Sequence, residues 1–299
     1  MKLVTLILKS GGTPRLGCEH AGRIVDLPAL CAASGTAVPQ TMFELICGGD
    51  AALALARTAI AAAPPATLAR FSYASDDAQL LAPLPRPGKI ICSGINYHGH
   101  FAENPNAKMP DEPFFFSKLP SAVIGPGAPI VLPARAPAQV DYEVEFAVVI
   151  GRPLARAAES DIMRAIFGYT ILNDVSARDV QFKDSQITLG KNFDTFAPIG
   201  PCIVTADEIP DPAHVALRTR VNGRTMQNGS TSDWVFSLPR LLSSLSQVMT
   251  LEPGDIVTTG TPAGVGLFQK PPVYLRAGDV VELEIDGIGV LRNPVVSAP

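Results

Sequence analysis

Apolar positions along the chain gather in short runs, and turns rich in glycine and proline separate these runs. Before residue 80, two runs are typical of strands and two alanine-rich stretches are typical of helices: 2–9, 22–27, 40–48 and 50–63. A linker punctuated by proline over residues 81–88 then breaks the pattern. We therefore predict a small N-terminal α/β unit over residues 1–85 and a second domain over residues 86–299.

Strand patterns dominate the chain beyond the linker. Apolar runs bounded by turn residues are expected to form strands over 89–94, 147–151, 168–172, 200–205, 217–222, 255–259 and 280–285. Helices are expected over 160–166 and over 234–249, and in the second of these segments apolar residues recur three and four positions apart. The fold class that follows is α+β and mostly β.

The composition narrows the classes of function. Hydrophobic residues make up 47% of the chain, charged residues make up 17%, and the formal net charge is −4. General nucleic-acid binding needs a basic excess or stripe, so nucleic acid is not an expected partner. The apolar stretch 51–63 contains Arg57 and ends at a proline pair, so it is too short to cross a membrane. Five cysteines without a Cys-x-x-Cys pair are typical of a cytoplasmic protein.

The strongest local signal is the acidic segment Asp-Tyr-Glu-Val-Glu over 141–145, which leads into an apolar run. Side chains alternate along a strand, so Glu143 and Glu145 share one face about 7 Å apart at Cα, and Asp141 shares that face. Converging carboxylates repel each other unless a cation lies between them, and their oxygens suit Mg²⁺, Mn²⁺ or Ca²⁺. Asp174, at the end of a later apolar run, could complete such a site. A solvent-facing acidic edge, and a turn or helix cap at Asp174, are the alternatives.

Three further segments carry candidate chemistry. His100 and Glu103 are three positions apart, so one helical turn would place them together, and the carboxylate would orient the ring for taking a proton from water. Lys191 lies in a turn of glycine, asparagine and aspartate, where it could bind an anionic substrate. The glycine-rich segment around Gly260, with the Thr261 hydroxyl, could hold a carboxylate. A solvated pair, a surface lysine and a structural turn are the respective alternatives.

These segments occur together and in one order, and over residues 89–299 they resemble the fumarylacetoacetate hydrolase family. The motifs that carry the resemblance are Asn96-Tyr97-x-x-His100-x-x-Glu103, Asp141-Tyr142-Glu143-Val144-Glu145, Asn173-Asp174-Val175-Ser176-Ala177-Arg178-Asp179, Gly190-Lys191-Asn192-Phe193-Asp194-Thr195-Phe196 and Thr259-Gly260-Thr261-Pro262-x-Gly264-Val265-Gly266. The resemblance implies a mixed β-sandwich roll, a homodimer, and Mg²⁺ in the active site with Mn²⁺ as a substitute.

Residue by residue, the resemblance implies three groups of site residues. The metal ligands would be Glu143, Glu145 and Asp174. The catalytic residues would be the water-activating pair His100 and Glu103, together with Lys191. The substrate contacts would be Arg178, Gln181 and Thr261, beside Gly260. Residues 104–113 would cover this site and select the tail of a small 2-oxo acid substrate.

Retention of both members of the His–Glu pair favours hydrolysis. The expected activity is that of a Mg²⁺-dependent hydrolase, which cleaves a C–C bond of a 2,4-dioxo acid such as an acylpyruvate or fumarylpyruvate through a metal-stabilised enolate. The alternative is a decarboxylase or isomerase of a 2-oxo dicarboxylic acid in aromatic catabolism, of the oxaloacetate decarboxylase or 2-hydroxyhepta-2,4-dienedioate isomerase type. A binding protein without catalysis is disfavoured, because it would not need a water-activating pair.

Overall fold

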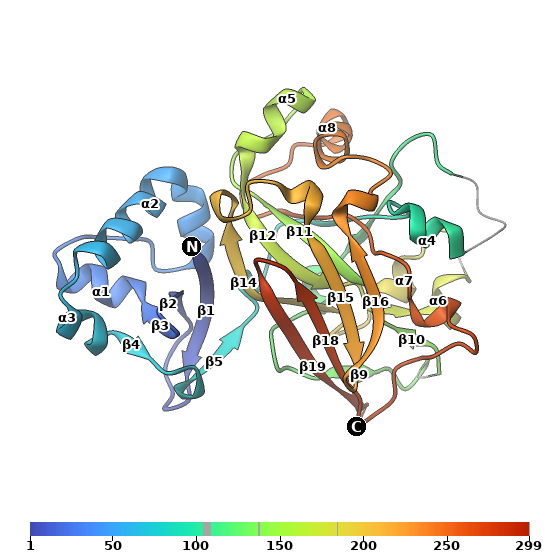
Figure 1. Cartoon of the computed structure of the whole chain (residues 1–299), viewed down its shortest axis with the longest axis horizontal. Helices are drawn as coiled ribbons and strands as arrows, with labels where there is room; N and C mark the ends of the chain where they lie inside the picture. The colour runs from blue at the N-terminus through green and yellow to red at the C-terminus, as the bar shows by residue number, and fades with distance from the viewer. Residues whose placement is uncertain (104–108, 137, 184, 299) are drawn as a thin grey trace.

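The computed structural model describes residues 1–103, 109–136, 138–183 and 185–298. It is built around one large sheet, and a smaller sheet packs against the part of it formed by residues beyond the linker 81–88 (Figure 1). Helices of the N-terminal unit lie at one end of the molecule. This arrangement confirms the predicted fold class, a mixed β-sandwich with a small N-terminal α/β unit.

The N-terminal unit combines short strands with helices. Its strands are β1 (Lys2–Leu8), β2 (Arg15–His20), β3 (Arg23–Asp26), β4 (Ser72–Tyr73) and β5 (Ala78–Leu81). Its helices are α1 (Leu27–Ala33), α2 (Met42–Ala62) and α3 (Pro65–Arg70). The helix α2 is broken at Gly49, whose φ of 55° lies in the left-handed region, and this break separates the two helical stretches that the sequence predicts.

The chain beyond the linker supplies the other strands. Those of the large sheet are β6 (Ile90–Ser93), β7 (Phe115–Lys118), β8 (Val123–Ile124), β11 (Val144–Ile150), β12 (Ile166–Asn173), β14 (Ala197–Thr205) and β17 (Ile256–Thr258). Those of the smaller sheet are β9 (Ile130–Leu132), β15 (Ala216–Val221), β16 (Arg224–Ser230), β18 (Val280–Ile285) and β19 (Gly289–Ser297). The strands β10 (Val140–Asp141) and β13 (Ser176–Ala177) form a separate short pair.

The large sheet crosses the predicted domain boundary. Its strands follow the order β4-β3-β2-β1-β14-β12-β11-β17-β6-β7, and Leu3 of β1 pairs with Ile203 of β14. The strands predicted beyond the linker are all present. The strands that were not predicted are short, or depend on pairing with a neighbour more than on a continuous apolar run of their own: β2, β4, β5, β7, β8, β9, β10, β13, β16 and β19.

The helices of the second domain are short, with one exception. They are α4 (His98–Glu103), α5 (Glu159–Ile162), α6 (Arg178–Gln181), α7 (Thr188–Lys191) and α8 (Leu238–Val248). The helix predicted over 160–166 is too long at its C-terminal end. The helix α5 ends at Ile162, a single 3₁₀ turn follows, and β12 begins directly after that turn. The helix predicted over 234–249 begins four residues later, since the Ser237 side chain accepts a hydrogen bond from the first turn of α8.

Strands β11 and β12 form the centre of the large sheet, and their residues are buried on both faces. On one face, Phe146 and Val148 pack with residues of the smaller sheet. On the other face, Ala147 and Val149 pack with residues of β1 and α2. Two buried faces explain the nearly continuous apolar sequence of β11. The polar residues of the site gather at one end of this strand pair, where β11 begins and β12 ends.

The helix α2 has the length and hydropathy of a membrane span. It is nevertheless broken at Gly49, and Leu45, Ile46 and Ala56 are buried in the core that α2 shares with the large sheet. The structure buries 33% of the apolar window of this helix, so part of its apolar composition serves packing.

The packing of α8 on the core provides a test of the fold. Leu242 of α8 is fully buried, whereas Leu55 of α2 is 45% exposed. We expect Leu242→Ala to lower the free energy of unfolding by about 2–5 kcal/mol, because burial is lost and a cavity remains. The control Leu55→Ala should cost under about 1 kcal/mol, since its side chain buries little apolar surface. Urea unfolding followed by circular dichroism would measure both, and equal losses would contradict this packing.

Candidate active site

Three carboxylates meet where β11 begins and β12 ends. Glu145 lies in β11, Glu143 directly precedes that strand, and Asp174 directly follows β12. The backbone N–H of Asp174 donates to the Glu143 carbonyl oxygen at 3.0 Å, and the Glu143 N–H donates to the Asn173 side chain at 3.1 Å. One oxygen from each of the three carboxylates lies within 4.8 Å of the others, and all three residues are buried. The structure thus brings the predicted carboxylate triad together.

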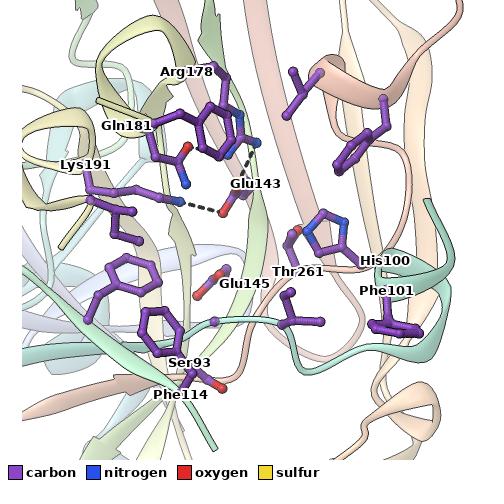
Figure 2. A pocket seen from close by; sticks show the side chains of 17 residues that line it. Ser93, His100, Phe101, Phe114, Glu143, Glu145, Arg178, Gln181, Lys191 and Thr261 are labelled. Carbon is purple, nitrogen blue, oxygen red and sulfur yellow. Dashed lines mark hydrogen bonds and ion pairs between the residues drawn. The ribbon is translucent and has the colours of Figure 1, made fainter. Parts of the chain in front are cut away.

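Three buried cations surround the triad. The Lys191 ammonium donates to Glu143 at 3.0 Å and also to Asp174, while the Lys118 ammonium lies 2.6 Å from the other oxygen of Asp174. The Arg178 guanidinium lies 2.6 Å from Glu143 (Figure 2). Burying carboxylates is costly unless cations and hydrogen bonds compensate them, so these three cations are what permits the triad to exist inside the protein.

The carboxylates of the triad differ in their electrostatic surroundings. Burial disfavours the charged form of Glu143, but Lys191 and Arg178 outweigh burial and lower its pKa to about 2. Burial raises the pKa of Glu145 well above its usual value, and the negative charges of Asp174 and Glu143 add to that rise. The Glu145 Oε2 atom is buried and has no hydrogen-bond partner within the described part of the chain. An unpartnered carboxylate oxygen beside two other carboxylates fits a divalent cation with oxygen ligands.

Asp141 does not join the triad, although strand alternation predicts that it shares the face of Glu143. Its carboxylate accepts hydrogen bonds from the backbone N–H groups of Gly266 at 2.7 Å and Leu267 at 2.9 Å. It also accepts from the Arg178 guanidinium at 2.8 and 3.0 Å. The chain leaves the strand geometry between β10 and β11, so alternation fails at this point. Asp141 therefore holds Arg178 in place.

Lys118 is a site residue that sequence reasoning missed. It lies at the end of β7, its side chain is fully buried, and its ammonium also donates to the carbonyl oxygens of Val175 at 3.1 Å and Lys191 at 2.5 Å. By bonding both to Asp174 and to the backbone of α7, Lys118 fixes the distance between a triad carboxylate and Lys191. The available signal was a lysine two residues after a run of three phenylalanines, since lysine is rarely buried unless it is paired.

The predicted His–Glu pair forms on α4. His100 Nδ1 lies 2.7 Å from Glu103 Oε2, and Glu103 Oε1 accepts a hydrogen bond from the Gly264 N–H at 2.8 Å. The second contact joins α4 to the glycine-rich segment and fixes the carboxylate. With Nδ1 bonded to Glu103, Nε2 is the ring nitrogen available toward the cavity.

A cavity of about 270 Å³ lies between the triad and the His–Glu pair (Figure 2). The predicted site residues that line it are His100, Glu143, Glu145, Arg178, Gln181, Lys191 and Thr261. Asp174 and Glu103 do not line the cavity themselves. Asp174 accepts a hydrogen bond from the lining residue Lys191, and Glu103 pairs with the lining residue His100. The volume is at the lower end of the range for ligand sites, which favours a small metabolite.

Two of the residues predicted to contact the substrate, Thr261 and Gly260, have structural roles of their own. Thr261 lines the cavity, yet its hydroxyl donates to the Val144 carbonyl oxygen at 2.9 Å and accepts from Gln227 at 2.8 Å. Gly260 is not among the lining residues. Its φ is +82°, and a Cβ at this position would meet the Gly94 carbonyl oxygen at 2.9 Å, so glycine permits close approach of two loops.

Gln181 bridges Arg178 and the cavity. Its amide oxygen accepts a hydrogen bond from Arg178 at 2.9 Å, which turns the amide nitrogen toward the cavity (Figure 2). A donor is therefore available beside Lys191 for an anionic ligand. Of the segment predicted to cover the site, residues 104–108 lie outside the described residues.

Comparisons with family models and with known proteins point to the same family. The family described as "Fumarylacetoacetate (FAA) hydrolase C-terminal" matches residues 89–296. The chain is 43% identical over 300 residues to a protein of Xenopus laevis named "Oxaloacetate tautomerase fahd2, mitochondrial". The aligned residues cover 99% of this chain and 90% of the Xenopus protein.

Two solved structures resemble the whole chain. A fumarylacetoacetate hydrolase from Exiguobacterium antarcticum has a TM-score of 0.83 at 38% identity, with full coverage of both chains. A maleylpyruvate hydrolase from Sphingobium sp. SYK-6, in complex with manganese(II) and pyruvate, has a TM-score of 0.78 at 34% identity, also with full coverage. The family match, the identity to the Xenopus protein and the shared fold lead to one conclusion: this chain belongs to the fumarylacetoacetate hydrolase family.

Proposed function

We propose that this protein is a divalent-metal-dependent tautomerase that interconverts the enol and keto forms of a 2-oxo acid, with oxaloacetate as the first substrate to test. The single observation that carries the proposal is that the His100–Glu103 pair faces the carboxylate triad across one small cavity, with aromatic side chains next to His100. The Xenopus relative, which is named an oxaloacetate tautomerase, supports the choice of substrate. Of the two alternative reactions expected from the sequence, isomerisation of a 2-oxo dicarboxylic acid is thereby favoured over C–C hydrolysis.

The triad would hold Mg²⁺ or Mn²⁺ through oxygens of Glu143, Glu145 and Asp174. The support is the set of oxygen donors and the unpartnered Oε2 of Glu145. When bound, such an ion supplies Lewis-acid stabilisation of negative charge on the 2-oxo oxygen. Lys191 and the Gln181 amide would bind and orient the neighbouring carboxylate of the substrate, because both line the cavity on the side of the triad.

Tautomerisation moves one proton between the C2 hydroxyl and C3, so the reaction consumes no water and leaves no other product. In the direction from enol to keto, the C2 hydroxyl loses a proton, C3 gains one, and the electron pair of the C2–C3 double bond forms the new C3–H bond. His100 Nε2 would carry this proton, and Glu103 would stabilise the imidazolium that forms on the way. The carboxylate also holds the ring in one orientation throughout.

Hydrolysis of a 2,4-dioxo acid is the second candidate. The resemblance to maleylpyruvate hydrolase favours it, because the same His–Glu pair would serve to activate water.

Product analysis separates the candidates. Enol oxaloacetate converted to keto oxaloacetate, without acetate or pyruvate from acetylpyruvate, supports the tautomerase. Acetate and pyruvate from acetylpyruvate would replace the proposal with the hydrolase, and pyruvate with CO₂ from oxaloacetate would replace it with a decarboxylase.

The role of His100 gives the first prediction for the reaction. We expect His100→Gln to lower kcat for enol oxaloacetate by about a hundredfold to ten-thousandfold, because the proton carrier is lost. The decay of enol absorbance in stopped-flow measurements with Mn²⁺ would report this change.

The chain contains a matched control for that variant. His214 forms the same kind of pair with Asp211, also three positions apart and at 2.7 Å, but its side chain is 70% exposed, against 16% for His100. His214→Gln should leave kcat unchanged. If both variants lost activity equally, or neither did, His100 would not be the proton carrier.

The triad gives a prediction about metal binding. Glu145→Gln keeps the shape of the side chain but removes its charge, so we expect the affinity for Mn²⁺ to fall at least about tenfold. Because burial disfavours the charged form of Glu145, the metal-free variant should be no less stable than the parent protein. Calorimetric titration with Mn²⁺ and thermal unfolding in EDTA would measure the two effects. Glu159→Gln, at an exposed position on α5, is the control and should leave the Mn²⁺ affinity unchanged. An unchanged Mn²⁺ affinity in Glu145→Gln would refute the assignment of Glu145 as a metal ligand.

A further inference from the structure

Apolar and aromatic side chains surround the charged groups of the cavity, and together they form an aromatic wall. Resting on the proposed tautomerase function, we propose that this wall receives an apolar or aryl substituent on C3 of the substrate, so that enols of the phenylpyruvate class are substrates alongside oxaloacetate. The residues that carry the proposal are Ile95, Phe101, Phe114, Phe116, Phe182 and Phe268, all of which line the cavity.

The charged groups of the cavity are confined to one end. Among the described lining residues, the lysine and arginine side chains are Lys191 and Arg178. Both are already paired with Glu143, and Arg178 also bonds to Asp141 and Gln181. One substrate carboxylate and the 2-oxo oxygen would occupy this end. A neutral apolar substituent on C3 would therefore need no cation at the other end of the cavity, where the lining side chains are mostly apolar.

The aromatic wall also borders the place where the proton is delivered. The ring of Phe268 lies 5.9 Å from that of His100, and Phe101 follows His100 on α4. Figure 2 shows Phe101 beside His100, across the cavity from Lys191. Since His100 must reach C3 to protonate it, a substituent on C3 would lie against this wall. Aromatic side chains bind another ring through apolar contact and favourable edge or stacked geometry.

Two phenylalanines of the wall keep large exposed surfaces. Phe114 is 50% exposed and Phe182 is 66% exposed. The position of Phe114 is built into the backbone, because a Cβ on Gly94 would meet its ring at 2.4 Å. The Phe114 ring then lies 6.5 Å from that of Phe116, which contacts the Lys191 ammonium. The apolar surface is therefore continuous from the mouth of the cavity to its charged end, as binding of an apolar substrate tail requires.

The experiment compares the enols of phenylpyruvate and oxaloacetate with the Mn²⁺-loaded full-length protein. We expect both to be converted to their keto forms. Phe114→Ala should raise KM for enol phenylpyruvate by about tenfold and change KM for oxaloacetate by less than about threefold, because apolar contact with the substituent is lost. Phe43→Ala is the matched control, since Phe43 is 49% exposed and lies on α2 of the N-terminal unit. It should change neither KM.

The outcomes separate this inference from the function on which it rests. Conversion of oxaloacetate without conversion of phenylpyruvate would overturn the inference and leave the proposed function standing. Equal increases in both KM values for Phe114→Ala would also overturn it, because the wall would then not distinguish the substituent. Conversion of neither enol, in a protein that binds Mn²⁺ normally, would overturn the proposed tautomerase itself.

Discussion

Charge compensation in a buried space is the constraint on which the site depends. Four carboxylates and three cations lie within one region from which solvent is largely excluded: Asp141, Glu143, Glu145, Asp174, Lys118, Lys191 and Arg178. Each cation contacts at least one carboxylate, because an uncompensated buried charge would cost more than the fold could supply. The carboxylate that these contacts compensate least is Glu145, and its electrostatic surroundings therefore favour an added divalent cation.

The large sheet makes this concentration of charge tolerable. Strands β11 and β12 are packed on both faces, by the smaller sheet and by the N-terminal unit, so their ends are rigid. The backbone contacts between Glu143 and Asp174 then place two carboxylates without help from flexible loops. Rigid placement is what an acid–base site needs, since reacting groups must already be positioned when the substrate binds.

The cavity differs in chemistry from one end to the other. In the proposed function, the charged end would bind the part of the substrate common to 2-oxo acids, and aromatic side chains border His100, where tautomerisation or hydrolysis would take place. A proton shift requires only the imidazole, whereas hydrolysis also requires a water beside it. An apolar wall next to His100 leaves few groups to hold such a water, which agrees with the preference for the tautomerase.

The sequence alone was sufficient for the family and for seven of the strands beyond the linker. It also placed His100 beside Glu103, and Glu143 near Glu145, because spacing along a helical turn or a strand determines which side chains share a face. Asp174 joined the predicted triad through the family resemblance. Local spacing could not predict that Asp141 turns away to hold Arg178, or that Lys118 of β7 compensates Asp174 after β12. Nor could it predict that Gly260 serves the close approach of two loops instead of lining the cavity. These contacts join residues far apart in the chain, and only the packing of the sheets decides which distant groups meet, since buried charges take whichever partners the tertiary structure brings within hydrogen-bonding distance.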